Sequence, residues 1–231
     1  MRLTRKAGLL YNERRLTLAA LFADATVVED PYYGGYALAG VNDSGSSSAT
    51  IIVPENTTVY ILAFHGQGFC IGKVLGTSYT AFKGNATPTL STYGPYIRVA
   101  LSIRNGTMVA VTFPNFSEEE VDAALGAINQ QQIYAGNSSS LGTRSTPNSS
   151  FNDSGLYVVA HGSNCSMSIS AKDYGMEKPA KDELLTPIFS CCTDNGTPNT
   201  VYLFEQGDKM YLSSNGTSAA RLYGGRISRL Y

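Results

Sequence analysis

Val59-Tyr60-Ile61-Leu62-Ala63-Phe64-His65-Gly66-Gln67-Gly68-Phe69-Cys70 is the stretch that decides the fold. Six apolar residues in a row, followed by histidine and glycine, predict a β-strand that ends in a turn. A related stretch, Leu156-Tyr157-Val158-Val159-Ala160-His161-Gly162-Ser163-Asn164-Cys165, repeats the strand, the histidine, the glycine and the cysteine. We therefore expect an internal duplication; the alternative is that β hairpins simply resemble one another.

Further apolar runs predict short strands along the whole chain. Together with the two stretches above, they cover residues 49–53, 58–64, 97–103, 107–113, 156–160, 200–204 and 209–212. Arg104-Asn105-Gly106-Thr107 stands between two of these runs, and Asn-Gly at such a place predicts a β hairpin. Gln206-Gly207-Asp208 predicts a weaker counterpart near the C-terminus.

One helix is predicted over residues 117–132. Ser117 and Glu120 have the spacing of a capping box, and the glutamates at 118–120 lie where the helix dipole favours negative charge. Val121, Ala124, Leu125 and Ile128 form one apolar face. Residues 3–23 are expected to form an amphipathic helix or an extended arm, although the short apolar run at 16–22 also fits a signal-peptide pattern.

These elements predict a mainly β protein with two tandem antiparallel β-sandwich or jelly-roll-like modules. We divide the chain into an N-terminal arm or helix (1–25), a first β module (26–134), a linker or loop rich in Ser, Asn and Gly (135–155), and a second β module with a basic C-terminal tail (156–231). A parallel α/β fold is disfavoured because helices do not alternate with the strands.

Charged residues make up only 15% of the 231 residues, whereas about a quarter is usual. Such a composition argues against a cytosolic helical protein, and the chain holds no apolar run long enough for a membrane span. The net charge is −1, yet basic residues gather at both ends of the chain. We expect these basic residues to contact neighbouring subunits: Arg2, Arg5, Lys6, Arg14, Arg15, Arg221, Arg226 and Arg229.

Asn-x-Ser/Thr triplets are the most specific signal in the sequence. Eleven of the 14 asparagines begin such a triplet, whereas chance placement would give roughly three. Asn85 is a weak acceptor because Pro88 follows its triplet, and a bridged Cys165 would obstruct Asn164. The remaining nine are the predicted glycosylation sites: Asn42, Asn56, Asn105, Asn115, Asn137, Asn148, Asn152, Asn195 and Asn215. The alternative is turn chemistry, because Asn-Gly, Asn-Ser and Asn-Asp are turn dipeptides that attract Ser and Thr.

The four cysteines are candidates for disulfides in an extracellular protein. Cys191 and Cys192 are adjacent and poorly placed to bond each other, so bridges from this doublet to Cys70 and Cys165 are the natural pairings. Four buried thiols are the alternative.

Catalytic motifs are lacking, and we expect no enzyme activity, no cofactor and no metal site. His65 and His161 each stand at the end of an apolar strand, where a structural role is the usual one. The acidic residues Asp194, Glu205 and Asp208 fit turns better than a cation site. Fifteen tyrosines without tryptophan could form a carbohydrate-binding or subunit-contact surface, densest at residues 31–36 and 222–225, although ordinary sheet faces also use tyrosine.

We therefore expect a structural subunit of an extracellular assembly, a virion capsid, turret or spike protein with glycosylated β modules facing outward. An archaeal-type surface filament or surface-layer subunit is one alternative, and a carbohydrate-binding adhesin is another. The expected partners are copies of the chain, other subunits and possible host glycans, with no specific nucleic acid. The expected location is the virion surface or the cell exterior.

Overall fold

The computed structural model describes residues 18–38, 48–65, 68–84, 86–103, 106–136, 139–140, 155–160, 167–170, 189–192, 198–204, 211–214, 221–222 and 225–230. Beyond Gln130, the description concerns the backbone and the side chain of Leu230. The described part is mainly β, and all of its strand pairs are antiparallel. This architecture confirms the predicted mainly β class.

The described residues of the first half form two sheets and two helices. A six-stranded sheet has the order β1-β9-β4-β5-β6, with β2 also pairing β9, and a three-stranded sheet has the order β3-β8-β7. The bounds are α2 (Leu18–Asp24), β1 (Thr26–Val27), β2 (Tyr36–Leu38), β3 (Ser48–Pro54), β4 (Val59–His65), β5 (Gly68–Leu75), β6 (Ser78–Gly84), β7 (Thr89–Tyr93), β8 (Tyr96–Ser102), β9 (Gly106–Thr112) and α3 (Glu118–Gly126).

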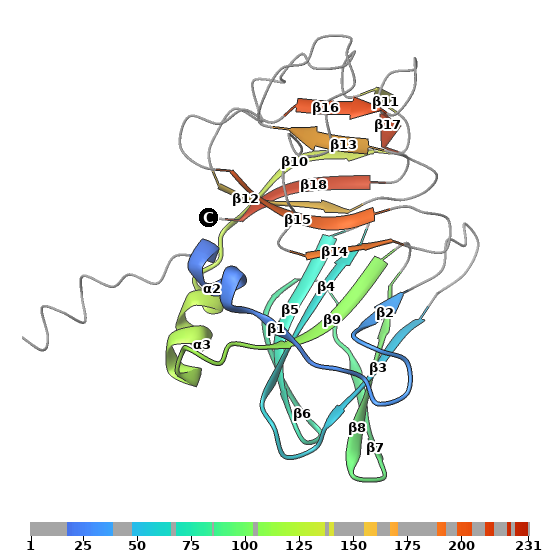
Figure 1. The fold of residues 1–231 in the computed structure, drawn as a ribbon, viewed down its shortest axis with the longest axis vertical. Helices are drawn as coiled ribbons and strands as arrows, with labels where there is room; N and C mark the ends of the chain where they lie inside the picture. The colour runs from blue at the N-terminus through green and yellow to red at the C-terminus, as the bar shows by residue number, and fades with distance from the viewer. Residues whose placement is uncertain are drawn as a thin grey trace, which may run out of the picture.

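A second sheet system follows. Its five-stranded sheet has the order β10-β18-β12-β15-β14, and two further pairs are β11-β17 and β13-β16. The bounds are β10 (Gln130–Gly136), β11 (Ser139–Ser140), β12 (Gly155–Ala160), β13 (Met167–Ser170), β14 (Phe189–Cys192), β15 (Pro198–Phe204), β16 (Tyr211–Ser214), β17 (Arg221–Leu222) and β18 (Gly225–Leu230). Figure 1 shows this system at one end of the first-half sheets.

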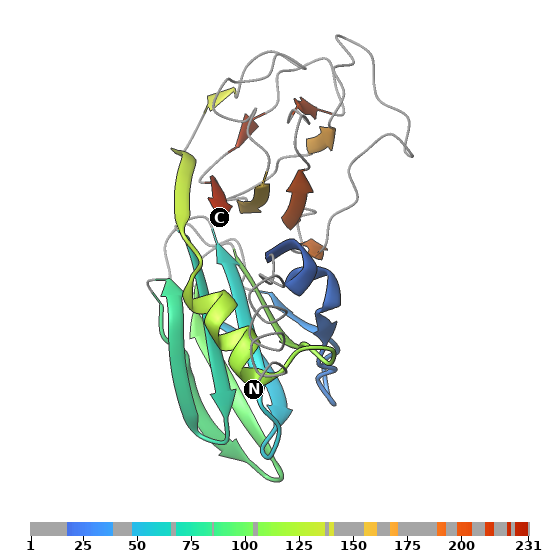
Figure 2. The same cartoon turned by 90° about the vertical axis from the view of Figure 1, so that its left-hand side faces the viewer.

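Two hydrophobic cores lie on opposite faces of the six-stranded sheet, because side chains alternate along a strand. Val59, Ile61 and Ala63 of β4 face the three-stranded sheet, where they meet Ile51, Val53, Ile97, Val99 and Leu101. Tyr60, Leu62 and Phe64 face the other way, where they meet Leu21 and Phe22 of α2 and Val121 and Leu125 of α3. The first half is thus built in three layers: helices, large sheet and small sheet (Figures 1 and 2).

Leu230, near the end of the chain, is 1% exposed and belongs to the core under the helices. It closes β18, which pairs with β10 on one side and β12 on the other. The expected basic C-terminal tail is therefore a strand within the second sheet. This difference arises because Ile227 and Leu230 alone interrupt the polar residues of 225–230, a pattern too weak to predict a strand from sequence.

The predicted helix is confirmed at its start and wrong at its end. Ser117 and Glu120 form the capping box, and Val121, Leu125 and Ile128 are buried as expected. The helix stops at Gly126 rather than near 132, because glycine is a poor helix former and the following glutamines pair with β18. Residues 130–134, which we assigned to the first module, thus belong by pairing to the second sheet.

All seven predicted strands are present as β3, β4, β8, β9, β12, β15 and β16, but the predicted hairpins are wrong. β8 pairs with β3 and β7, whereas β9 pairs with β1, β2 and β4, so β8 and β9 belong to different sheets and do not form a hairpin. β15 and β16 also belong to different sheets. The duplication stays a prediction: β4 pairs with β5 and β9, and β12 pairs with β15 and β18, but residues 161–165 of the second copy lie outside the described residues.

Candidate functional site

A tight turn on the first half presents two exposed tyrosines. Asp30 and Gly34 exchange backbone hydrogen bonds of 3.2 and 3.1 Å around Pro31, Tyr32 and Tyr33. Proline presets the backbone angle that such a turn needs at its first position. Tyr32 is 57% exposed and Tyr33 is 80% exposed, so both rings project into solvent.

The carboxylate of Asp30 holds this turn in place. Although only 3% of Asp30 is exposed, its Oδ1 accepts the backbone N–H groups of Tyr32 (2.8 Å) and Tyr33 (2.9 Å). Its Oδ2 accepts the N–H of Ile52 at 2.7 Å, on the free edge of β3. Three donors compensate the cost of burying the charge, and the third also closes an edge that could otherwise pair with another strand.

Two glycines close the turn for different reasons. Gly34 has φ +91°, a left-handed conformation that side chains rarely adopt. Gly35 has an ordinary backbone, but a Cβ there would lie 2.7 Å from Cγ1 of Val27. The Pro-Tyr-Tyr-Gly-Gly sequence therefore forms a well-defined turn. Tyr32 and Tyr33 lie in this turn and not on a sheet face, which was the alternative role for these tyrosines.

The turn borders a pocket on the outer face of the three-stranded sheet. In the ladder, Ile52 of β3 pairs with Arg98 of β8, and Arg98 pairs with Ser91 of β7, so these three positions stand in one row. The pocket has a volume of about 620 Å³, within the range of roughly 300 to 1,000 Å³ that small-ligand sites have. Its lining consists of Tyr32, Tyr33, Thr50, Ile52, Ser91, Thr92, Tyr93 and Arg98.

Tyr32 connects the turn to the β7–β8 hairpin through its ring. Its centroid lies 5.7 Å from that of Tyr93 and 6.4 Å from that of Tyr96, both close to perpendicular. Tyr33 is tilted against Tyr32 with centroids 6.4 Å apart. Edge-to-face contacts of this kind stabilise aromatic pairs and fix the orientation of the rings. We call Tyr32, Tyr33, Tyr93 and Tyr96 the tyrosine cluster.

Arg98 is the only charged residue of the pocket lining. It is exposed, and within the described part of the chain it has no carboxylate partner. Thr50, Ser91, Thr92 and three tyrosines, which all carry hydroxyl groups, line the same pocket. Exposed aromatic rings, several hydroxyl residues and a guanidinium can bind a polar ligand with one acidic group; the residues that line this pocket contain no nucleophile–base pair for catalysis.

The sequence identified the tyrosines but missed Asp30, Arg98 and Ser91. Asp-Pro followed by Gly-Gly was a turn signal that could have placed Tyr32 and Tyr33 outside a sheet. Arg98 stands in an apolar strand as one of its outward positions, with the burial alternating between inside and outside along β8. A single arginine in a strand has many possible roles. Its place in the pocket depends on the neighbouring strands, so the sequence alone could not predict it.

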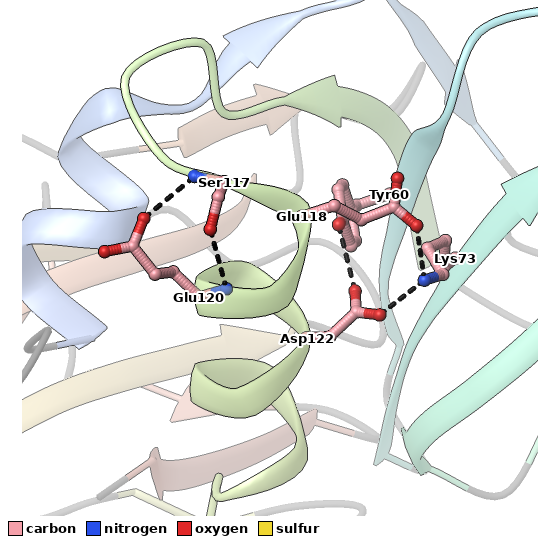
Figure 3. Close-up of polar contacts among 6 residues, drawn as sticks. All are labelled: Tyr60, Lys73, Ser117, Glu118, Glu120 and Asp122. Atoms are coloured by element: carbon pink, nitrogen blue, oxygen red, sulfur yellow. Dashed lines mark hydrogen bonds and ion pairs between the residues drawn. The ribbon is translucent and has the colours of Figure 1, made fainter.

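A second polar cluster fastens α3 to the large sheet (Figure 3). Lys73 of β5 donates to Glu118 at 2.8 Å and to Asp122, and the hydroxyl of Tyr60 donates to Asp122 at 3.0 Å. These hydrogen bonds raise the pKa of Lys73 above its ordinary value of 10.5. Burial, followed by the Asp122 hydrogen bond, raises the pKa of Tyr60. Lys73 therefore stays protonated, and the cluster is an ion-paired clamp.

Two of the nine predicted glycosylation sites lie within the described residues. Asn56 is exposed in the turn after β3. Asn115 is exposed too, but its backbone N–H and its side-chain amide both donate to Asp24, and Ser117 of its triplet caps α3. Helix capping thus accounts for Ser117 without a glycan. Asn42, Asn105, Asn137, Asn148, Asn152, Asn195 and Asn215 lie outside the described residues.

Cys70, a disulfide candidate, is a free and fully buried thiol. Its sulfur donates to the carbonyl of Ala86 at 2.9 Å and lies 3.1 Å from the Tyr79 hydroxyl, which is left to act as donor. Burial raises the pKa of the Cys70 thiol, and the Tyr79 hydrogen bond opposes this rise. The predicted bridge to Cys70 is therefore absent. Cys165 lies outside the described residues, as do the side chains of Cys191 and Cys192.

The other predicted site residues are placed only in part. Arg2, Arg5, Lys6, Arg14 and Arg15 lie outside the described residues, as does His161. The backbones of Arg221, Arg226 and Arg229 belong to β17 and β18. In the described ranges, no three His, Cys, Asp or Glu side chains come together as a metal site, and no helix there has the length and apolarity to cross a membrane.

Comparison with known proteins does not add a family to these observations. Searches with family models, curated proteins and solved structures gave no match to this chain.

Proposed function

We propose that the chain is a structural subunit of an extracellular assembly, a virion capsid, turret or spike protein with its first β module facing outward. In this proposal the two halves are tandem β-sandwich modules, and the basic residues at the chain ends contact neighbouring subunits. The proposal combines the surplus of glycosylation triplets with the build of the first half.

The observation that carries the proposal is that the two ends of the first half differ: one lies next to the second sheet, and the other is free. Its far turns gather at the end opposite the second sheet (Figure 1): Gly76 donates to the carbonyl of Glu55 at 3.0 Å, and Pro54 pairs with Tyr96 beside the β7–β8 turn. Exposed Asn56 lies at this free end. Leu230 lies in the core next to the second sheet. A module joined at one end, with a glycan acceptor at the other, suits a projecting surface domain.

Mass spectrometry and assembly measurements test the proposal together. The full chain is secreted from eukaryotic cells, its Asn56 peptide is measured with and without glycan removal, and its particle mass is followed with concentration. We expect an occupied Asn56 and oligomers that grow with concentration. The matched variant Asn56→Gln should lose one glycan mass and still assemble. A bare Asn56 on a chain that stays monomeric at every concentration would overturn the proposal.

A carbohydrate-binding adhesin is the second candidate function, and the tyrosine-lined pocket is the observation that favours it. Rigid exposed tyrosines beside hydroxyl residues offer large contact area with polar tips. This function differs from the first in needing no assembly: the isolated monomer would bind its ligand. Saccharide binding by the monomeric protein therefore tests the adhesin function independently of assembly.

The filament alternative has less support. It requires an N-terminal segment that completes a sheet of a neighbouring subunit, and residues 3–23, predicted to form a helix or an extended arm, are the segment that could do so. Leu21 and Phe22 of this segment are instead 0% and 1% exposed in the chain's own core. Giving this part to a neighbour would leave a hole beneath Leu125 and Leu230, at a cost of several kcal/mol.

A further inference from the structure

We propose that the pocket beside the tyrosine cluster binds an acidic saccharide, a pyranose that carries a carboxylate. This inference rests on the second candidate function, saccharide binding, and is independent of the assembly role. It assigns the ring contacts to Tyr32 and Tyr33, the hydroxyl contacts to Ser91 and Thr50, and the carboxylate to Arg98.

The exposed rings match the apolar face of a pyranose. An aromatic ring has a negative face that attracts the weakly positive C–H groups of a sugar ring, and it leaves the sugar hydroxyls free for other partners. Tyr32 and Tyr33 are more than half exposed although they stand on a fixed turn. Such exposure of large aromatic side chains, held together in one place, marks an interaction site.

Arg98 determines the charge of the ligand. Guanidinium and carboxylate groups match as two parallel hydrogen bonds, and Arg98 has no such partner within the described part of the chain. Neighbouring Ser91 and Thr50 can donate to or accept from sugar hydroxyls. A neutral sugar would leave the guanidinium unused, whereas a nucleic acid would need a row of cations and the lining has only one.

Preorganisation makes the assignment stronger. The buried carboxylate of Asp30 fixes the backbone of both tyrosines before any ligand arrives, and ring contacts with Tyr93 and Tyr96 fix Tyr32. A site whose side chains are already ordered loses less entropy on binding. The pocket is thus ready for a ligand without closing.

Two acidic probes and their neutral counterparts test the inference. Trigalacturonate and 3′-sialyllactose are each compared with their methyl esters by calorimetric or NMR titration of the monomeric protein. We expect at least one acidic probe to bind at least tenfold more tightly than its counterpart, and the preference to weaken with salt. Arg98→Gln should remove the preference, Tyr32→Ala should weaken binding of both members of the pair, and Lys83→Gln, on β6 of the other sheet, should change neither.

The outcomes distinguish the claim that Arg98 binds a carboxylate from the claim that the pocket binds a saccharide. Equal binding of acidic and neutral probes would overturn the role of Arg98 while keeping a saccharide site. No binding of any probe by the folded chain would overturn both this inference and the adhesin function, and would leave the assembly role to its own test. Unfolding curves of each variant confirm that the exposed substitutions leave the fold intact.

Discussion

Asp30 and Ile52 are joined by a hydrogen bond of 2.7 Å from the Ile52 backbone N–H to a buried carboxylate oxygen. The two residues are 22 positions apart, so the bond ties the tyrosine turn to the edge strand of the small sheet. The same carboxylate orders Tyr32 and Tyr33. One side chain therefore controls both the shape of the pocket and the closure of a sheet edge.

Replacement of Asp30 should destabilise the first half. In Asp30→Ala, three backbone donors lose their acceptor, and we expect a loss of about 2 to 4 kcal/mol in the free energy of unfolding. Urea denaturation measures this loss. Glu29→Ala, at the exposed neighbouring position, is the control and should change stability by less than about 0.5 kcal/mol. Equal stability of the two variants would contradict the role of Asp30.

Ser117 separates helix capping from glycosylation. In protein made without glycans, Ser117→Ala should cost about 0.5 to 2 kcal/mol because the N–H of Glu120 loses its acceptor. Ser117→Asp also destroys the triplet at Asn115 but keeps a capping oxygen, so it should unfold like the wild type. If Ser117→Asp is as unstable as Ser117→Ala, capping is not what this serine contributes.

Cys70 should resist alkylation in the folded protein. Its thiol is buried and its pKa is raised, so little thiolate meets the reagent. Iodoacetamide should modify Cys70 only after denaturation, as measured by peptide mass spectrometry without prior reduction. Rapid labelling in the native state, or a Cys70 peptide that appears only after reduction, would contradict a buried free thiol.

The fold should lose stability in alkaline solution. Burial raises the pKa of both Tyr60 and Tyr79, and ion pairing raises that of Lys73, so the folded state keeps protons that the unfolded chain releases near its ordinary values of 10.0 to 10.5. With more protons bound in the folded state, the free energy of unfolding falls as pH rises. Cys70 adds the same effect from about 9.0. Urea midpoints at pH 8, 9, 10 and 11 measure the decline.

A variant assigns part of that decline to one residue. Tyr60→Phe removes one titrating group, so its stability should fall less steeply between pH 9 and 11 than that of the wild type. Parallel curves for the two proteins would show that Tyr60 does not contribute.

Leu230 should matter to the first half despite its distance in sequence. Leu230→Ala leaves a cavity in the core under the helices, and we expect a loss of about 2 to 5 kcal/mol. Leu75→Ala, the same substitution at a side chain that is 48% exposed, is the matched control and should cost under about 1 kcal/mol. Similar losses in both variants would indicate that Leu230 is not part of this core.

The sequence was sufficient where a residue's neighbours in the chain determine its state. The apolar runs around Ile51, Leu62 and Val158 predicted strands, and Ser117 with Glu120 predicted the start of a helix. The sequence was insufficient to predict which strands pair, because pairing depends on strands that are distant in the chain. Asn105-Gly106 looks like a hairpin turn, yet β8 and β9 belong to different sheets because each finds other partners.

The pocket shows the same division. The cluster of tyrosines at 31–36 was visible in the sequence, but its meaning was not, because sheet faces also use tyrosine. The role of Asp30 depends on its hydrogen bond to Ile52, which the sequence does not reveal. Arg98 belongs to the pocket because it pairs with Ile52 and Ser91 on the adjoining strands. The register of strand pairing brings these separate residues together into a site, and no single segment of sequence specifies that register.

The side-chain sizes on the two faces of β4 also favour a single pairing register for this strand. The residues facing the small sheet are Val59, Ile61 and Ala63, while those facing the helices are Tyr60, Leu62 and Phe64. A shift by one residue would exchange the two sets, forcing aromatic rings into the narrow space between sheets and leaving small side chains under the helices. Since both faces reject the exchange, the strand has one acceptable register, and misaligned pairing is excluded without any polar marker.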